Sequence, residues 1–131
     1  MHAPLRHEID DTDQVRPHVR LSHLVLREAL AGGFTAVELA APPRAMPTAR
    51  AQSGGTWQWF KSFPPAVYDS LVAHFKQMAG MTPEQREGDG TILVRLAGQD
   101  TAITLRVQRN EQGLDVLLLH FPARPAAEAA T

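Results

Sequence analysis

Apolar residues at helical spacing predict two helices in the chain. The first lies between Ser22, which can cap its start, and Gly32-Gly33, which ends it. Its apolar positions recur on one side of a helix, at Leu24, Val25, Ala29 and Leu30. The second helix follows Pro64-Pro65 and ends before Gly80. Its apolar stripe has the spacing i, i+4, i+8, i+11, in Val67, Leu71, Phe75 and Met78. Both helices therefore need an apolar surface to pack against.

Alternation of apolar and polar residues predicts strands in the rest of the chain. Residues 35–39 alternate, and residues 56–60 place both tryptophans on one face. The final third is predicted as a three-stranded antiparallel meander, with turns at residues 98–100 and 110–113. Its apolar rows are Ile92/Val94/Leu96, Ile103/Leu105/Val107 and Val116/Leu118/His120. Residues 41–51 hold three prolines and are predicted as a loop, with a short strand at its end as an open alternative.

These elements predict a single α+β domain. With two helices interleaved among about six strands, we expect a mixed or antiparallel sheet with both helices packed on one face. A chain of 131 residues with 44% hydrophobic and 21% charged residues is typical of one globular core. We assign this domain to residues 20–121. Residues 1–19 are predicted to be a flexible arm and residues 122–131 a flexible tail, because neither stretch has much apolar surface to bury.

Charge and composition narrow the class of partner. A formal net charge of −1 gives no overall field that attracts a polyanion, so no nucleic-acid partner is expected. No run approaches the roughly 18 apolar residues of a membrane span, and direct membrane insertion is not expected. The start of the chain is too polar for a signal peptide, and the lack of cysteine fits a reducing compartment. We therefore expect a cytoplasmic protein.

No motif in the chain predicts catalysis, a metal site or a cofactor. The six histidines show neither HxxxH nor HxH spacing, so we expect no metal ligands among them. No serine lies in a G-x-S-x-G elbow, and no phosphate-binding G-x-x-x-x-G-K-[ST] loop is present. We interpret Gly88-Asp89-Gly90 as a tight turn that enters a strand at Thr91. Catalytic residues, metal and cofactor are therefore all predicted to be absent.

Four residues on the predicted strands are candidates for a partner interface. Trp57 and Trp59 fit either core packing or contact with a partner. Arg95 and Arg106 lie opposite the aliphatic rows of their strands, which indicates either a solvated sheet face or a place for phosphate. The sequence leaves both alternatives open.

An ordered series of short motifs runs through the chain. Residues 71–81 read L-V-A-H-F-K-Q-M-A-G-M and are followed by P-E-Q-R and G-D-G, and residues 103–107 read I-T-L-R-V. Residues 114–121 continue the series downstream, and residues 24–39 and 49–54 belong to it upstream. Taken in this order, the motifs resemble those of the domain that precedes the motor in type II secretion and type IV pilus assembly ATPases. The likeness spans about residues 22–121.

This resemblance implies a PAS-like domain whose arginines approach nucleotide at the interfaces of a hexamer. The role of contacting nucleotide phosphate in trans would fall here to Arg50 and Arg106. Gln52 and Thr91 stand where the family has further arginines. The chain has no Walker motif to hold Mg²⁺ and the transferred phosphate. We therefore expect a non-catalytic domain that acts on a motor partner in trans.

Three functions remain open at the level of sequence. The first is an interaction or regulatory module, whose partner is a secretion or pilus motor ATPase or a second copy in a homo-oligomer. Its interface would be formed by Trp57, Trp59, Arg95 and Arg106. The second is a PAS-like sensor that binds a small molecule between the sheet and the helices. The third is an enzyme of a type that the motifs do not identify.

Overall fold

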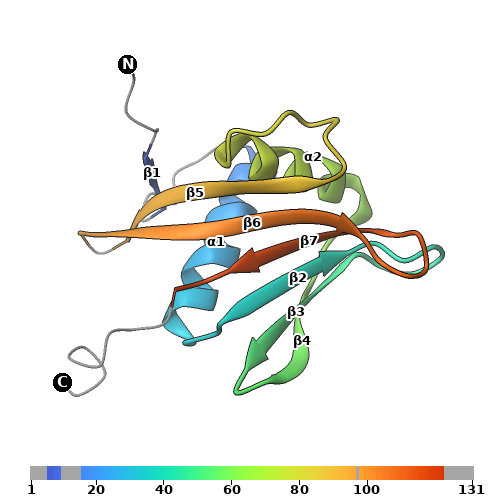
Figure 1. The fold of residues 1–131 in the computed structure, drawn as a ribbon, viewed down its shortest axis with the longest axis horizontal. Helices are drawn as coiled ribbons and strands as arrows, with labels where there is room; N and C mark the ends of the chain where they lie inside the picture. The colour runs from blue at the N-terminus through green and yellow to red at the C-terminus, as the bar shows by residue number, and fades with distance from the viewer. Residues whose placement is uncertain (1–5, 10–15, 97, 123–131) are drawn as a thin grey trace.

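A seven-stranded sheet is the centre of the structure. The computed structural model describes residues 6–9, 16–96 and 98–122, and within them the strands follow the order β1-β5-β6-β7-β2-β3-β4 (Figure 1). β1 pairs with β5 in parallel, and the other neighbours are antiparallel. The strands are β1 (Arg6–Glu8), β2 (Ala36–Ala40), β3 (Thr48–Ser53), β4 (Thr56–Ser62), β5 (Gly88–Leu96), β6 (Gln99–Arg109) and β7 (Asp115–His120). The mixed α/β content agrees with the prediction in outline, with seven strands instead of about six.

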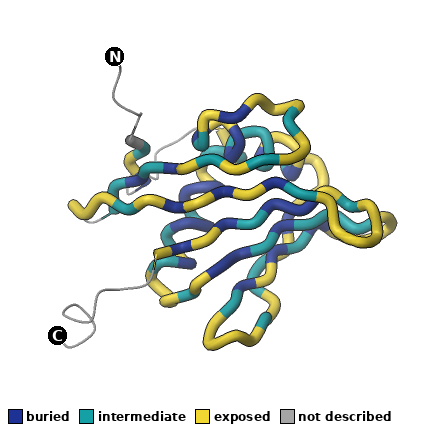
Figure 2. The backbone as a smooth tube through the Cα atoms, viewed as in Figure 1, coloured by how far each residue is buried: buried dark blue, intermediate teal, exposed yellow. Residues whose placement is uncertain are grey.

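Both helices cover the same face of the sheet. α1 (Pro17–Ala31) and α2 (Pro65–Met78) each begin with a proline, whose fixed φ suits the first turn of a helix. In Figure 1 both helices lie behind the sheet, and the strands turn their uncovered face to the viewer. Buried and exposed residues alternate along the strands (Figure 2), because successive side chains point to opposite faces. The core therefore fills the space between the helices and one face of the sheet, and the other face is open.

The core confirms most of the predicted apolar pattern. Three of the four stripe positions in α2 are buried, namely Leu71, Phe75 and Met78, whereas Val67 is half-buried. The rows predicted for β5 and β6 join the same cluster, through Ile92, Val94, Ile103, Leu105 and Val107. α1 adds Val25, Leu26 and Ala29, which are completely buried. Helical and strand periodicity thus identified the side chains that meet between the layers.

The predicted start of the first helix is wrong. α1 begins at Pro17, and its N-cap position is occupied by Arg16, which makes no side-chain cap. Ser22 lies inside the helix and is completely buried, with its Oγ donating a hydrogen bond to Val19 O at 2.7 Å. A serine within a helix can satisfy its hydroxyl on an earlier carbonyl in this way. Its capping preference alone therefore did not locate the boundary.

The predicted N-terminal arm is also wrong where the structure describes it. Arg6–Glu8 form β1, and Ile9 is completely buried. α1 begins at Pro17. Three residues are too few to show alternation in the sequence, but they suffice to align with Leu93, Val94 and Arg95 of β5. The remainder of the predicted arm, and residues 123–131 of the predicted tail, lie outside the described residues.

The structure decides one open alternative and corrects one strand prediction. β3 begins at Thr48, directly after the buried Pro47, so the end of the predicted loop is a full strand between β2 and β4. In β7 the residues of the core cluster are Leu117 and Leu119, followed by Phe121. Of the predicted row Val116/Leu118/His120, Val116 is buried outside that cluster, Leu118 is half-buried and His120 is exposed. β7 lies between two other strands and is apolar on both faces. Its period could therefore not indicate which face meets the helices.

The Gly88-Asp89-Gly90 motif begins β5 and is not a turn before it. Its three residues pair with Val107, Arg106 and Leu105 of β6. A Cβ added at Gly90 would lie 2.6 Å from the backbone oxygen of Ala79, just after the end of α2. This close approach of strand to helix requires glycine at Gly90.

Candidate functional site

The open face of the sheet carries all the residues that were predicted to contact a partner. Residues that lie directly opposite one another on neighbouring strands share a face. The strand register consequently arranges one row of side chains across the sheet from β4 to β5. In order, this row consists of Trp59, Arg50, Glu38, Leu118, Arg106 and Asp89. Trp57 lies beside the β4 end of the row, whereas Arg95 lies further along β5.

Arg50 lies between a carboxylate and an aromatic ring. Its Nη2 is 2.6 Å from Glu38 Oε1, and its guanidinium carbon is 5.1 Å from the centroid of the Trp57 ring. Trp59, directly opposite Arg50, is 66% exposed, and its Nε1 donates a hydrogen bond to Ser62 Oγ. Trp57 and Trp59 therefore form a tryptophan patch at the β4 end of the open face, with a cation at its inner side.

Arg106 forms a separate site on the same face. Its Nε is 3.0 Å from Asp89 Oδ1, on the β5 side. In the row, Glu38 and Leu118 lie between Arg50 and Arg106. The Cα atoms of the two arginines are therefore three inter-strand spacings apart, or about 14 Å. Because Asp89 holds the Arg106 guanidinium on the side away from Arg50, the structure does not bring the two arginines to one phosphate position.

Arg95 lies at the end of the open face near the β5–β6 hairpin. Its Nε is 3.1 Å from Asp100 Oδ1 on β6 and 3.9 Å from Glu8 Oε1 on β1. The hydrogen bond to Asp100, followed by the charge of Asp100, raises the pKa of Arg95 above its usual value. Each of the three predicted arginines thus faces a carboxylate on a neighbouring strand.

The arginines of these ion pairs can leave their carboxylates and bind a group of another molecule instead. Exposed pairs of this kind contribute about 0–1 kcal/mol each, so their disruption costs little. A guanidinium released from its carboxylate can donate two hydrogen bonds to a phosphate or to another carboxylate. Since acids and bases alternate along the row, the surface suits a protein with mixed charges better than a uniform polyanion.

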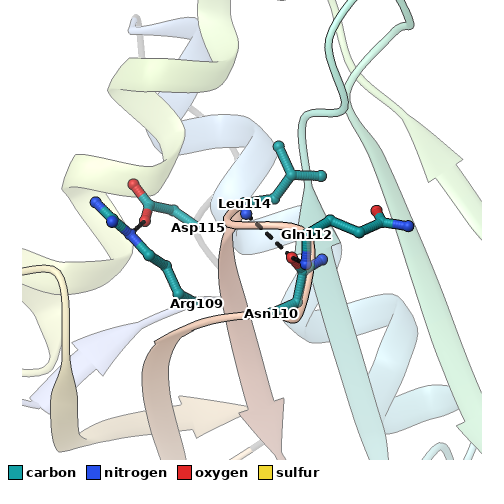
Figure 3. A network of polar contacts seen from close by, with 5 residues as sticks. All are labelled: Arg109, Asn110, Gln112, Leu114 and Asp115. Atoms are coloured by element: carbon teal, nitrogen blue, oxygen red, sulfur yellow. Dashed lines mark hydrogen bonds and ion pairs between the residues drawn. The ribbon is translucent and has the colours of Figure 1, made fainter.

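A groove separates α2 from the end of the β6–β7 hairpin, on the helix-covered side of the sheet. Its volume is about 530 Å³, within the range of small-molecule sites. On one wall, Lys76 is buried and donates from Nζ to Pro83 O at 3.1 Å. On the other wall, Arg109 Nε lies 3.3 Å from Asp115 Oδ1 (Figure 3). The groove therefore combines both signs of charge with apolar surface.

The hairpin turn that bounds this groove is fixed by Asn110. Its Oδ1 accepts hydrogen bonds from the backbone N–H groups of Gln112 and Leu114, at 2.9 and 3.0 Å (Figure 3). The predicted turn at residues 110–113 is thereby confirmed. Within the groove, burial raises the pKa of Tyr68, and the charges of Asp69 and Asp115 raise it further. Its phenol therefore stays protonated, and a hydrogen-bond donor, into the alkaline range.

Four histidines interact where β1, α1 and α2 meet, which the sequence spacing did not reveal. The rings of His18 and His74 have centroids 5.6 Å apart and are inclined by 77°. Burial lowers the pKa of His74 to about 4, and the charges of His18, His23 and His7 lower it further. Burial also lowers the pKa of His7, against a hydrogen bond to the backbone of Met78. These side chains, His7, His18, His23 and His74, are named the histidine cluster below.

The histidine cluster does not form a metal site in this geometry. Among the described residues, no group of three or more His, Cys, Asp or Glu side chains could hold a metal ion. The cluster brings His74 of α2 against histidines of β1 and α1 that lie far from it in the sequence, so local spacing could not predict it.

Comparison with known proteins adds no relative: no family model matches the chain, and neither does any curated protein. In the part of the chain that the structure describes, neither helix is long and apolar enough to span a membrane.

Proposed function

We propose that this chain is a non-catalytic interaction or regulatory module, related to the PAS-like domain in front of the motor in secretion and pilus assembly ATPases. It binds such a motor in trans, in the cytoplasm, through the open face of its sheet. The observation that carries the proposal is the exposed row in which the tryptophan patch, Arg50 and Arg106 lie on one uncovered face. Aromatic and arginine side chains are the residues most often found at the centres of protein interfaces.

The positions of the motifs support this relationship. Residues 71–81 span the end of α2 and the connection that follows it, and residues 88–90 begin β5. Residues 103–107 lie in β6, and residues 114–121 include β7. The helix-to-strand passage implied by the resemblance therefore coincides with a helix and a strand of this fold. The lack of a Walker motif in the sequence supports a role without ATP chemistry of its own.

Crosslinking in cells, followed by mass spectrometry, tests the proposal. The wild-type chain is expected to capture a secretion or pilus motor, and Arg106→Ala is expected to reduce the yield. Arg109→Ala is the matched control, because it removes an equally exposed, ion-paired arginine from the same strand on the helix-covered side. Capture of no such motor, or equal losses in both variants, would contradict a motor bound through the open face.

A second candidate function is a small-molecule sensor, which the groove between α2 and the β6–β7 hairpin favours. A ligand that binds only the folded state raises the melting temperature, because it stabilises the fold by RT ln(1 + [L]/Kd). A screen by thermal shift separates this function from the first. A hit whose effect is abolished by Arg109→Ala and retained by Arg106→Ala would assign the ligand to the groove.

A further inference from the structure

β4 is an outer strand of the sheet, and its outer edge is available for pairing. Among the described residues, β3 is the neighbour of β4 on one side and no strand lies on the other. Along such an edge, every second residue directs its backbone N–H and C=O outward, where another strand can pair with them. At the opposite edge of the sheet, β1 has three residues, whereas β4 has seven. β4 therefore offers the longer template.

The first part of β4 lacks the features that usually protect an edge strand. Residues 56–60 read T-W-Q-W-F and contain neither a charged residue nor a proline. Lys61 follows them, but its Nζ lies 2.7 Å from Glu28 of the same chain. The pairing with β3 shifts between Ala49 and Arg50, which leaves Phe60 without a partner on β3, and it resumes at Lys61. An uncharged five-residue edge with an exposed tryptophan remains.

We propose that two copies of this chain pair through β4, antiparallel and about a two-fold axis at Gln58. The two sheets then become one continuous sheet. In this register Trp57 of each copy lies opposite Trp59 of the other, Thr56 lies opposite Phe60, and the two Gln58 residues face each other. This inference rests on the proposed function, because it takes the open face as an interaction surface and assigns a second copy to its β4 edge.

The chemistry of residues 56–60 favours a second copy as the occupant. Directly opposed aromatic residues stabilise an antiparallel pair, and here both tryptophan pairs form on the open face. Like charges do not meet, since the paired residues carry none. A register centred on Trp59 would instead bring the charged Lys61 of each copy opposite Trp57 of the other and place the unpaired Phe60 next to the two-fold axis. Because a five-residue pairing buries little surface, the dimer is expected to be weak and to depend on concentration.

Crosslinking through a single introduced thiol tests the register directly, since the natural chain contains no cysteine. In the proposed dimer the Cα atoms of the two Gln58 residues lie about 4.5–5.5 Å apart, which suits a disulfide. Gln58→Cys is therefore expected to form a covalent dimer under mild oxidation. Thr56→Cys is the control, because its two copies are separated by about four residues along the strands. Equal crosslinking of both variants, or none with Gln58→Cys, would overturn the proposal.

Sedimentation velocity of the wild-type chain provides the second measurement. A shift from monomer to dimer with rising concentration is expected, and Trp59→Lys is expected to abolish it. Met46→Lys changes another exposed hydrophobic residue, 53% exposed and outside β4, and is expected to leave the dimer intact. A monomer up to about 1 mM, where weak complexes are populated, would overturn the proposal. Capture of a motor through Arg106 does not require the β4 edge, so the two proposals can fail separately.

Discussion

The ring of His18 on α1 meets the ring of His74 on α2 edge to face, with 5.6 Å between their centroids. This contact joins the two helices that cover the sheet. Protonation of both rings would place two positive charges at this distance, near His23 of α1 and His7 of β1. The native structure therefore favours the neutral form of His74 and of His7.

We predict that the stability of the fold decreases as the pH falls from about 6.5 towards 4. The pKa of His74 is about 4 in the folded chain, against 6.5 for an unperturbed histidine, mainly because the ring is buried. Between these values the unfolded chain binds a proton that the folded chain does not, so acid favours unfolding, and the full contribution is present above pH 6.5. Urea unfolding at a series of pH values measures the effect.

The comparison of two variants isolates His74 from carboxylates that titrate in the same range. His74→Gln is expected to flatten the pH dependence, because the titrating ring is removed. His120→Gln, at an exposed histidine on the open face, is expected to leave it unchanged. Identical pH profiles for the wild-type chain and His74→Gln would show that this ring does not control acid stability.

We predict that Phe75→Ala lowers the free energy of unfolding by about 3–5 kcal/mol. Phe75 is completely buried between α2 and the sheet, and its removal loses apolar burial and leaves a cavity. Val67→Ala, at the half-buried start of the same stripe, should cost clearly less. Denaturant unfolding measures both variants. A loss below about 1 kcal/mol for Phe75→Ala would show that its ring does not contribute to the packing of the core.

Gly90→Ala is expected to destabilise the fold by about 1–3 kcal/mol, the usual range for overpacking. The added Cβ would approach the backbone oxygen of Ala79 to 2.6 Å, and a backbone atom cannot rotate away as a flexible side chain does. Gly90 has an ordinary negative or extended backbone, so steric contact and not φ is the cause. Thermal melting of the variant beside the wild-type chain decides this, and an unchanged melting temperature would contradict the close approach.

Local periodicity predicted the layers of this fold but not its edges or its polar clusters. The stripe of Leu71, Phe75 and Met78 was predictable because burial repeats with the helix. β1 was not predictable, since three residues carry no measurable period and their strand forms only against β5. For β7, an apolar sequence on both faces concealed which side meets the helices.

The candidate site was predictable in part for the same reason. Alternation correctly placed Arg106 opposite the buried row of Ile103, Leu105 and Val107. Its ion pair with Asp89 depends on pairing between β5 and β6, which no local pattern encodes. The contact of His18 with His74 likewise depends on how α1 packs against α2. Contacts between distant parts of the chain thus determine both the ion pair and the histidine contact.

We predict that the purified chain does not hydrolyse ATP above a no-protein control. The sequence contains no glycine-rich phosphate loop with its lysine, which positions the transferred phosphate in motor ATPases. Release of inorganic phosphate, followed over several purification columns, measures this. ATPase activity that co-purifies with the chain at a constant specific activity would contradict the assignment of a non-catalytic module.

The last prediction concerns the two arginines of the open-face row. Arg50→Ala and Arg106→Ala are each expected to change the free energy of unfolding by less than about 1 kcal/mol, because their ion pairs are exposed. Arg50→Ala should cost slightly more, since the Arg50 guanidinium also lies over the Trp57 ring. With about 14 Å between them and different carboxylate partners, their effects on stability should add within about 0.5 kcal/mol.

The same variants separate stability from binding. If the row contacts a nucleotide-loaded motor, each variant should weaken that complex, because a guanidinium offers paired donors to phosphate or carboxylate. The melting temperature should stay nearly constant, because a guanidinium on an open sheet face contributes little to folding. Affinity for the captured motor is measured with Arg109→Ala as control, whose ion pair with Asp115 lies on the other side of the sheet. Unaltered affinity in both Arg50→Ala and Arg106→Ala would reduce these residues to solvated surface and leave the tryptophan patch as the part of the face to test next.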